Sequence, residues 1–594
     1  MTIITKTNNY KCDTKGVYSA DVDKDTGQLS WDWIGRPIYL KSVFRIIDTG
    51  ELFWNICFKC NDGWQEDVIP RIDVTERNFT NLLRKGADVT TWKTKLMINY
   101  LIESEAKMPI SLQHRQLGWT TYDRNNYYAH QQLYSVTSNK KSEYIGELNI
   151  NKAGSFNRWS NVIKKLVVGI PEMELALCLG FSAVLVGYIN RILNLHADSM
   201  IFHISGNSTT GKTSAATVAV SGFGDSKEGA HSLIQSFNGT DNALTNLMAN
   251  NNGVPIVCDE TSLSLMGTQK LVNVLYTWAK NISKARLDKN SQKKPQSEWA
   301  TTIITTGEGS LLDQINQNEG IRARVFELKN LQWTKSANHS NVLVKELSQN
   351  YGHGVEPFVT TLLSYLPKDI QNSWENETAK IEEAIPKSKF NNRISKKYAL
   401  ITMTAQLLNE TFDFNLNIER IKALLVQQEV ESIEEREIGP KALELIREWL
   451  LMNRKHFYIN NNDVSENQTI WGRININKTK QQTEVFILPS VFKQMLQERG
   501  FSDHSVVLRE LDSIKALIKE KDANQNKYHI RRVIKGMENR GRNGVSTYGL
   551  KLDGAFIHTV FTSNEIQTKQ RKGKKSSKQN TRKEEPELVD IDDM

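Results

Sequence analysis

A loop bounded by two glycines constrains the fold of this chain more than any other segment. Residues 206–213 read GNSTTGKT, a complete Walker A sequence, and they follow the apolar run 200–204. Glycine at both ends lets consecutive backbone N–H groups turn toward a phosphate, and the N-terminus of a following helix adds partial positive charge. We therefore predict a buried strand, a phosphate-binding loop and a helix, in that order.

The side chains of this loop predict its ligands. Lys212 is placed to reach the β- and γ-phosphate oxygens, and the Thr213 hydroxyl is placed to take one position on Mg²⁺. The expected cofactors are therefore ATP and Mg²⁺. The residues predicted to bind the nucleotide are Gly206, Asn207, Ser208, Thr209, Thr210, Gly211, Lys212 and Thr213.

A second apolar run, 254–258, ends in the carboxylates Asp259 and Glu260. This is a Walker B sequence. An Asp at the strand tip can hold Mg²⁺ through water, and the adjacent Glu can orient and polarise the attacking water. A nucleotide switch that barely hydrolyses often lacks the second carboxylate, so Glu260 predicts turnover.

A third strand is expected to end in hydroxyl groups. The β-branched run 299–304 leads to Thr305 and Thr306, and either hydroxyl could be the sensor that contacts the γ-phosphate or the lytic water. The alternative is that the two threonines only cap the strand.

Two arginines, Arg322 and Arg324, stand just before the apolar run 325–328. Either one suits an arginine finger that reaches the γ-phosphate of a neighbouring subunit, while the other pairs locally. A finger supplied by a neighbour requires a ring or filament, so the motif predicts a homo-oligomer.

The segment 282–295 is polar and basic between strand-like flanks. A hairpin here would project toward the central pore of a ring and present cations to a phosphate backbone. A solvated charged loop is the alternative. The residues predicted to bind DNA are Arg286, Lys289, Lys293 and Lys294.

The composition is that of a globular chain with several domains. Its 594 residues are 39% hydrophobic and 24% charged, which is enough for about two to four cores. Residues 1–9 are polar, so no secretory signal is expected, and the apolar stretch 175–189 is shorter than a bilayer span. We predict a buried helix there, a cytoplasmic protein and no membrane contact.

Five cysteines are too few for a disulfide framework, which fits a reducing compartment. Cys57 and Cys60 have the spacing of half a zinc site, but no second pair follows. Because they stand in the strand-like run 53–58, two strand cysteines are the alternative to a metal site.

The hydrophobic pattern divides the chain into several parts. Residues 1–145 are predicted to form a β-rich N-terminal domain with one helix near 92–105. Residues 146–400 alternate helices and strands, which indicates a three-layer α/β domain with a mainly parallel sheet. Residues 401–562 combine helices with a β-hairpin, which suggests a winged-helix-like C-terminal domain.

In this last domain, helices are expected over 441–451, 492–498 and 506–519, and a basic hairpin loop is expected over 539–544.

Residues 563–594 lack aromatic residues and periodicity, which predicts a disordered tail. The tail is basic first and acidic last, so a basic arm on nucleic acid and an acidic tip for a protein partner are expected. A solubilising tail is the alternative.

Tryptophans are frequent in the N-terminal domain. They could stack on bases, although packing in the core is the more common fate. They are Trp31, Trp33, Trp54, Trp64, Trp92 and Trp119.

The order of these motifs resembles that of AAA+ ATPases described as a domain of unknown function in mobile elements. It runs from Walker A to Walker B with Asp-Glu, then to an inserted basic hairpin, a sensor strand and Gly-x-Arg-x-Arg at 320–324. In layout the chain is similar to the self-loading, MCM-like replicative helicases of staphylococcal cassette chromosome elements. The motifs cover 150–400, and the flanking parts match in layout.

The resemblance implies a bacterial hexameric ring that translocates on single-stranded DNA and unwinds forked DNA during replication of a mobile genetic element. Arg393, in a helix after the sheet, resembles a sensor 2 residue that completes the nucleotide site. MCM-type sensor strands usually end in Asn, whereas this one ends in Thr305 and Thr306.

Two other functions stay open on the sequence alone. A non-motor replication initiator or helicase loader would bind duplex DNA through the C-terminal domain and use ATP only to assemble. A P-loop ATPase that acts on protein would show no stimulation by DNA.

Overall fold

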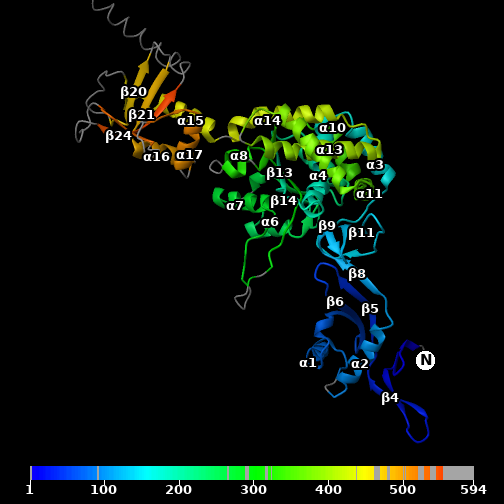
Figure 1. The fold of residues 1–594 in the computed structure, drawn as a ribbon. Helices are drawn as coiled ribbons and strands as arrows, with labels where there is room; N and C mark the ends of the chain where they lie inside the picture. The colour runs from blue at the N-terminus through cyan, green and yellow to red at the C-terminus, as the bar shows by residue number, and fades with distance from the viewer. Residues whose placement is uncertain are drawn as a thin grey trace, which may run out of the picture. The chain divides into compact units, whose positions relative to one another are not determined.

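The chain folds into two units, divided between Ser432 and Ile433 (Figure 1). The computed structural model describes residues 3–89, 92–263, 266–287, 293, 295–314, 319–322, 324–388, 390–436, 438–459, 469–477, 482–499, 501, 504–519, 528–534 and 544–552. The predicted tail at 563–594 lies outside these residues.

The centre of the first unit is a five-stranded sheet in the order β14-β16-β17-β13-β18. Every strand pairing described in this sheet is parallel, so the parallel α/β arrangement expected within 146–400 is present. Parallel strands bring all their carboxyl ends to one edge. The strands are β13 (Met200–Ser205), β14 (Ile234–Ser236), β16 (Ile256–Asp259), β17 (Thr302–Gly307) and β18 (Val325–Lys329).

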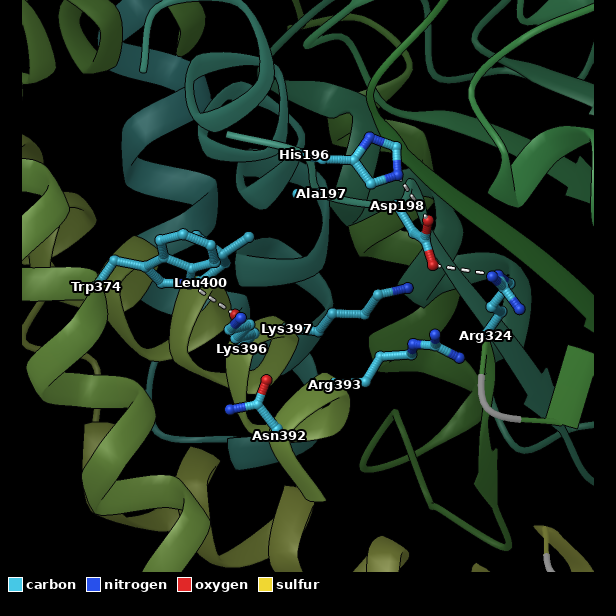
Figure 2. Close-up of a pocket in the computed structure, with 10 residues that line it drawn as sticks. All are labelled: His196, Ala197, Asp198, Arg324, Trp374, Asn392, Arg393, Lys396, Lys397 and Leu400. Atoms are coloured by element: carbon cyan, nitrogen blue, oxygen red, sulfur yellow. Dashed lines mark hydrogen bonds and ion pairs between the residues drawn. The ribbon is translucent and has the colours of Figure 1, made fainter. Parts of the chain in front are cut away.

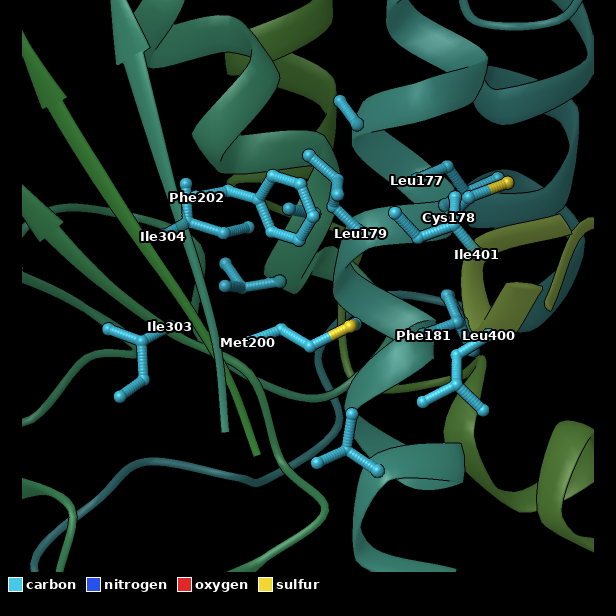
Figure 3. Close-up of a cluster of buried hydrophobic side chains, with 14 of the residues drawn as sticks. Leu177, Cys178, Leu179, Phe181, Met200, Phe202, Ile303, Ile304, Leu400 and Ile401 are labelled. Atoms are coloured by element: carbon cyan, nitrogen blue, oxygen red, sulfur yellow. The ribbon is translucent and has the colours of Figure 1, made fainter. Parts of the chain in front are cut away.

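Helix α4 (Pro171–Arg191) packs against the sheet and is 94% buried in its most apolar window. It is long and apolar enough to cross a membrane, but its burial confirms the predicted core helix. Figure 3 shows Leu179 of α4 beside Phe202 of β13, whereas the Phe181 ring packs against Phe223 and Phe358. Gly180 allows α5 (Lys212–Ser221) to approach, because a Cβ there would lie 1.8 Å from the Ala219 carbonyl oxygen.

Further helices surround this core. The limit predicted at residue 400 falls inside α13, whereas the described contacts divide the chain after Ser432, inside α14. The helices are α3 (Phe156–Leu166), α6 (Asp241–Leu247), η3 (Thr261–Leu263), α7 (Thr268–Ala279), α8 (Leu311–Gln314), α9 (Glu319–Arg322), α10 (Ala337–Leu347), α11 (Val355–Leu363), α12 (Pro367–Ala384), α13 (Asn391–Phe412) and α14 (Ile418–Arg436).

The N-terminal part contains two sheets around a core of its own. An antiparallel sheet holds β1 (Ile3–Lys6), β2 (Tyr10–Asp13), β3 (Val17–Val22) and β4 (Leu29–Gly35). A mixed sheet has the order β12-β8-β5-β6-β7. Its strands are β5 (Ile38–Ile46), β6 (Leu52–Cys60), β7 (Gly63–Pro70), β8 (Ile110–His114) and β12 (Glu143–Tyr144).

Helix α2 (Thr94–Glu105) confirms the helix predicted near 92–105 and supplies Met97, Ile98 and Tyr100 to this core. Short helices η1 (Arg71–Asp73), α1 (Glu76–Phe79) and η2 (Thr80–Lys85) precede it. Cys57 and Cys60 are free and buried on β6, and the described residues contain no cluster of three or more His, Cys, Asp or Glu suited to a metal. Both cysteines thus lie on the predicted strand.

A small third sheet joins the N-terminal part to the α/β core. It consists of β9 (Leu117–Tyr122), β10 (Asn125–Ala129), β11 (Leu133–Tyr134) and β15 (Asn251–Asn252). β15 belongs to the core segment and pairs in parallel with β9. Trp119 donates from Nε1 to the Val184 carbonyl at 2.9 Å, and the Tyr128 hydroxyl donates to the Gly253 carbonyl at 2.8 Å. Residues before and after 145 therefore share one buried cluster.

The second unit begins near α15 (Ile438–Met452) and has a core of its own. Helices α16 (Pro489–Glu498) and α17 (His504–Ser513) pack beside a sheet, which fits the predicted helix-and-hairpin pattern. The sheet has the order β19-β20-β21-β24-β22, with β23 on β24. It contains β19 (Phe457–Ile459), β20 (Gly472–Asn477), β21 (Gln482–Ile487), β22 (Leu517–Ile518), β23 (His529–Arg532) and β24 (Val545–Leu552), and η4 (Arg454–His456) precedes β19.

The helix predicted over 506–519 is too long. It ends at Ser513, because Lys515 adopts a positive φ of 60° and Leu517 pairs with Leu550 as a strand. Strands β23 and β24 form the predicted hairpin, but residues 539–543 of its basic loop lie outside the described part of the chain.

Candidate nucleotide-binding site

The Walker A loop leaves the carboxyl end of β13 and enters α5, as predicted. Gly206 and Gly211 have φ values of 155° and 91°, and Thr209 has 79°, which bends the backbone into a tight turn. A Cβ at Gly211 would lie 2.7 Å from the Thr334 side chain. Glycine at 211 is therefore required both by its backbone conformation and by the space available.

Lys212 lies over the loop. Its Nζ donates to the carbonyls of Gly206 at 2.7 Å and Asn207 at 3.0 Å, so the ammonium group is held at the loop's own backbone. Lys212 is also the first residue of α5, whose N-terminus carries partial positive charge. A cation and a helix N-terminus at one loop suit a polyanionic phosphate chain.

The two Walker B carboxylates lie at the end of β16, beside the sensor strand. The Thr306 hydroxyl donates to Asp259 Oδ1, and it accepts a hydrogen bond from the Glu260 backbone N–H at 3.0 Å. Glu260 has a positive φ of 61°, which is uncommon for a residue other than glycine and is typical of functional sites. The structure thus brings Thr306, Asp259 and Glu260 together.

Thr305 points away from these carboxylates. Its hydroxyl contacts Nδ1 of the buried His203 at 2.9 Å, and the other His203 nitrogen contacts the Gly309 carbonyl at 2.9 Å. Burial lowers the pKa of His203 below its ordinary value, and the nearby Glu327 carboxylate opposes that shift. His203 therefore links the P-loop strand to the loop that follows the sensor strand.

Glu308 is a further residue at this site, and the motifs predict no role for it. The Ser208 hydroxyl of the P-loop donates to Glu308 Oε1 at 2.5 Å, so the end of the sensor strand touches the phosphate-binding loop. A carboxylate just beyond a strand that ends beside a P-loop was the available signal in the sequence.

The oxygen donors at this edge suit a magnesium ion. Asp259 is partly exposed at the strand end, and the exposed side chain of Thr213 adds a hydroxyl near the start of α5. Mg²⁺ prefers oxygen ligands, takes one or two carboxylates and keeps several waters, so this donor set fits it.

Arg324 lies at the opposite end of the same sheet. It precedes β18, which runs parallel to β13 in the register Ile201↔Val325 to Ser205↔Lys329. A parallel strand rises about 3.3 Å per residue, so a strand of five residues places Arg324 about 16 Å from the P-loop of its own chain. Its Nε donates to Asp198 Oδ2 at 3.1 Å and its Nη1 to the Gly320 carbonyl at 2.7 Å. The Arg322 side chain lies outside the described part of the structure.

A pocket of about 270 Å³ opens beside Arg324 (Figure 2). Arg393, Lys396 and Lys397 of α13 line it together with Arg324, and Asp198 contributes a carboxylate. Lys397 Nζ donates to the Ser199 carbonyl at 3.1 Å, which fixes α13 at the amino end of β13. Arg393 therefore lines the same pocket as Arg324, at the end of the sheet opposite the P-loop of its own chain.

The basic segment after α7 has paired flanks. Isolated bridges join Ile282 to Glu298 and Leu287 to Lys293, as in the predicted hairpin. Arg286 donates to Asn242 Oδ1 at 2.5 Å, so it is tied to α6. Lys289 and Lys294 lie outside the described residues.

The fold and the site define an α/β chain with a Walker A loop and paired carboxylates at the carboxyl edge of a parallel sheet, and with a separate C-terminal unit of helices and a β-hairpin. Residues 10–298 match the family model "Domain of unknown function (DUF927)", and residues 437–555 match the "Cch helix turn helix domain".

Among solved structures, the chain is similar to one described as the active helicase Cch of SCCmec type IV. The two share 24% sequence identity with a TM-score of 0.74, over 94% of this chain and 99% of that chain. A comparison with curated proteins finds no match. The resemblance stated from the motif order is confirmed: the chain has the fold of that protein, and its C-terminal unit matches a helix-turn-helix family.

Proposed function

We propose that this protein is an ATP-driven DNA helicase with an AAA+ core, which translocates on single-stranded DNA and unwinds duplex while a mobile element replicates in the bacterial cytoplasm. The observation that carries the proposal is the meeting of Lys212, Asp259, Glu260 and Thr306 at one edge of the sheet. The shared fold with the Cch structure supports the same function.

Each of these residues has a distinct task in hydrolysis. The loop backbone and Lys212 bind the phosphates of ATP, and Thr213 and Asp259 hold Mg²⁺, which neutralises charge on the phosphates when bound. Glu260 orients the attacking water and accepts its proton. Thr306 positions both acidic residues, since it donates to Asp259 and accepts from the Glu260 backbone.

The position of Arg324 supports assembly into a hexameric ring. At about 16 Å from its own P-loop it acts only on a neighbour's nucleotide, where a guanidinium neutralises charge that develops on the γ-phosphate. Arg393 lines the same pocket, so its predicted sensor 2 role also operates across the subunit boundary.

Two parts of the chain are proposed to contact DNA. The hairpin residues Arg286, Lys289, Lys293 and Lys294 grip single-stranded DNA through its phosphates. The helix-turn-helix unit contacts duplex DNA, which favours loading at a defined place. The acidic end of the tail is the proposed contact for a protein partner.

The test is unwinding of forked DNA by the full chain with ATP and Mg²⁺. We expect ATP hydrolysis stimulated by single-stranded DNA, and strand displacement that Glu260→Gln abolishes. Blocking each single-stranded arm in turn gives the polarity. Absence of unwinding by the wild-type chain, under conditions where it hydrolyses ATP, contradicts the proposal.

A non-motor initiator or loader is the second candidate, favoured by the helix-turn-helix match. It predicts sequence-specific duplex binding without strand displacement. The double variant Arg286→Glu/Lys293→Glu separates the two: a motor that uses the hairpin loses unwinding and keeps duplex binding through the C-terminal unit. Unwinding that survives these charge reversals contradicts the pore-hairpin assignment.

A further inference from the structure

One face of the N-terminal sheet β1–β4 carries aromatic side chains where a surface usually carries polar ones. The strand register places Lys11 beside Tyr18 and Tyr18 beside Trp33, and it pairs Ala20 with Trp31. Cross-strand partners point to the same side of a sheet, so these residues share one face. We call Lys11, Tyr18, Trp31, Trp33, Trp92 and Lys93 the aromatic face.

The other side of this sheet accounts for its packing. Tyr10, Cys12, Val17 and Ile34 alternate with the aromatic residues and are buried in the core that includes α2. The sheet therefore needs no second covering layer for stability. Trp33 is nonetheless 48% exposed and Trp92 is 76% exposed.

Trp33 is held in place although it is exposed. Its indole occupies space above Gly16, where a Cβ would lie 2.2 Å from the indole Nε1. Lys93 donates from Nζ to the Trp33 carbonyl at 3.1 Å, which ties the start of α2 to β4. A preorganised ring loses little conformational entropy when a ligand stacks on it.

Lysine ammonium groups lie over these rings. Lys11 Nζ is 4.5 Å from the Trp31 ring centroid and 5.0 Å from that of Tyr18. Lys93 Nζ is 4.5 Å from the Trp33 centroid and 4.3 Å from that of Trp92. Trp33 and Trp92 are exposed, Tyr18 and Trp31 are half-buried, and each of the four rings has an ammonium group at cation–π distance.

The carboxylates of the same strands either point to the other side of the sheet or are buried. Asp21 and Asp32 alternate with Trp31 and Trp33 and point to the opposite side. Asp13 shares the parity of Lys11, but it is buried and accepts hydrogen bonds from the backbone N–H groups of Lys15 and Gly16. The strand residues of this face therefore present positive charge with little acidic charge.

We propose that the aromatic face binds a single strand of nucleic acid, with unpaired bases stacked on Trp31, Trp33 and Trp92 and phosphates contacted by Lys11 and Lys93. Exposed rings favour a single strand over a duplex, because duplex bases are already stacked on one another. The site extends the proposed function without depending on it, since binding here requires no ATP.

The test measures binding of a fluorescent oligothymidylate of about 30 nucleotides to the full chain without nucleotide. The double variant Trp33→Ala/Trp92→Ala is expected to bind about tenfold more weakly or worse. Trp64→Ala is the matched control, because Trp64 is 44% exposed but lies on β7 of another sheet. Quenching of tryptophan fluorescence on binding should fall in the double variant and persist in Trp64→Ala.

Three outcomes overturn the proposal. They are unchanged affinity in a folded double variant, an equal loss in Trp64→Ala, and a change in oligomeric state by sedimentation with DNA binding intact, which would make the face a contact between copies. Lys11→Ala/Lys93→Ala keeps the test valid if the tryptophan variants fail to fold, and it should weaken binding and reduce its salt dependence. ATP hydrolysis without DNA should stay unchanged, so a failure here is distinct from a failure of the ATPase.

Discussion

The carboxyl and amino edges of the central sheet carry opposite chemistry. The carboxyl edge has the phosphate loop with Lys212, the carboxylates of Asp259 and Glu260, and the Thr306 hydroxyl. The amino edge has a pocket whose lining includes Arg324, Arg393, Lys396 and Lys397, with Arg324 anchored on Asp198. A strand length separates the two edges, so Arg324 does not reach the P-loop of its own chain. Under the proposed function, the two edges would complete one site only between neighbouring subunits.

The strongest test of this comparison mixes two inactive variants. Arg324→Ala should lower ATP hydrolysis about 10³-fold, because the transition-state charge loses its guanidinium. Lys212→Ala should be inactive because it loses phosphate binding. A mixture should regain part of the activity, since an intact Lys212 edge then meets an intact Arg324 edge from the other variant.

Mixtures that co-assemble and stay inactive would contradict action across a subunit boundary. Arg322→Ala is the matched control: a comparable loss there, with Arg324→Ala active, would assign the finger to Arg322. Thermal unfolding of Arg324→Ala should be recorded beside hydrolysis, because the variant also removes one of the two side-chain partners of the partly buried Asp198, the other being His196.

The next test separates binding from chemistry at the carboxyl edge. Glu260→Gln should reduce hydrolysis about 10²-fold while ATP still binds, because the amide cannot accept the proton of the attacking water. Lys212→Ala should lose binding itself. Equilibrium binding of a fluorescent ATP analogue distinguishes the two, and loss of binding in Glu260→Gln would show that Glu260 supports the loop instead.

The smallest expected effect compares neighbouring threonines. Thr306→Val should lower kcat about tenfold, because the hydroxyl that positions Asp259 and the Glu260 backbone is lost. Thr305→Val should leave kcat near wild type and lower the free energy of unfolding by about 1 kcal/mol, since its hydroxyl partners the buried His203. The reverse pattern would make Thr305 the sensor.

Motifs of fixed spacing were predictable because they depend on local backbone geometry. The loop at 206–213, the carboxylates at 259–260 and the helix near 92–105 all follow from residue type and periodicity. The sequence did not distinguish Thr305 from Thr306 as the sensor, since only the orientation of the strand decides which side chain faces the Walker B strand.

Contacts between distant segments were not predictable in this way. His203 contacts a residue about a hundred positions away, and Asp198 holds Arg324 through the register of β13 and β18. The burial of individual tryptophans could not be predicted either. Trp54 and Trp119 are buried and Trp33 and Trp92 are exposed, and composition alone does not distinguish the two pairs. The early end of α17 likewise depends on pairing with β24.

The pairing of β15 with β9 has a practical consequence for dissecting the chain. A fragment that starts at residue 146 would leave the Asn251–Asn252 backbone without its neighbour and remove the Trp119 and Tyr128 rings from the α4 surface. Cutting before β9 retains this small sheet. The structural limit of the α/β core is therefore set by strand pairing, and it lies further toward the N-terminus than the sequence motifs do.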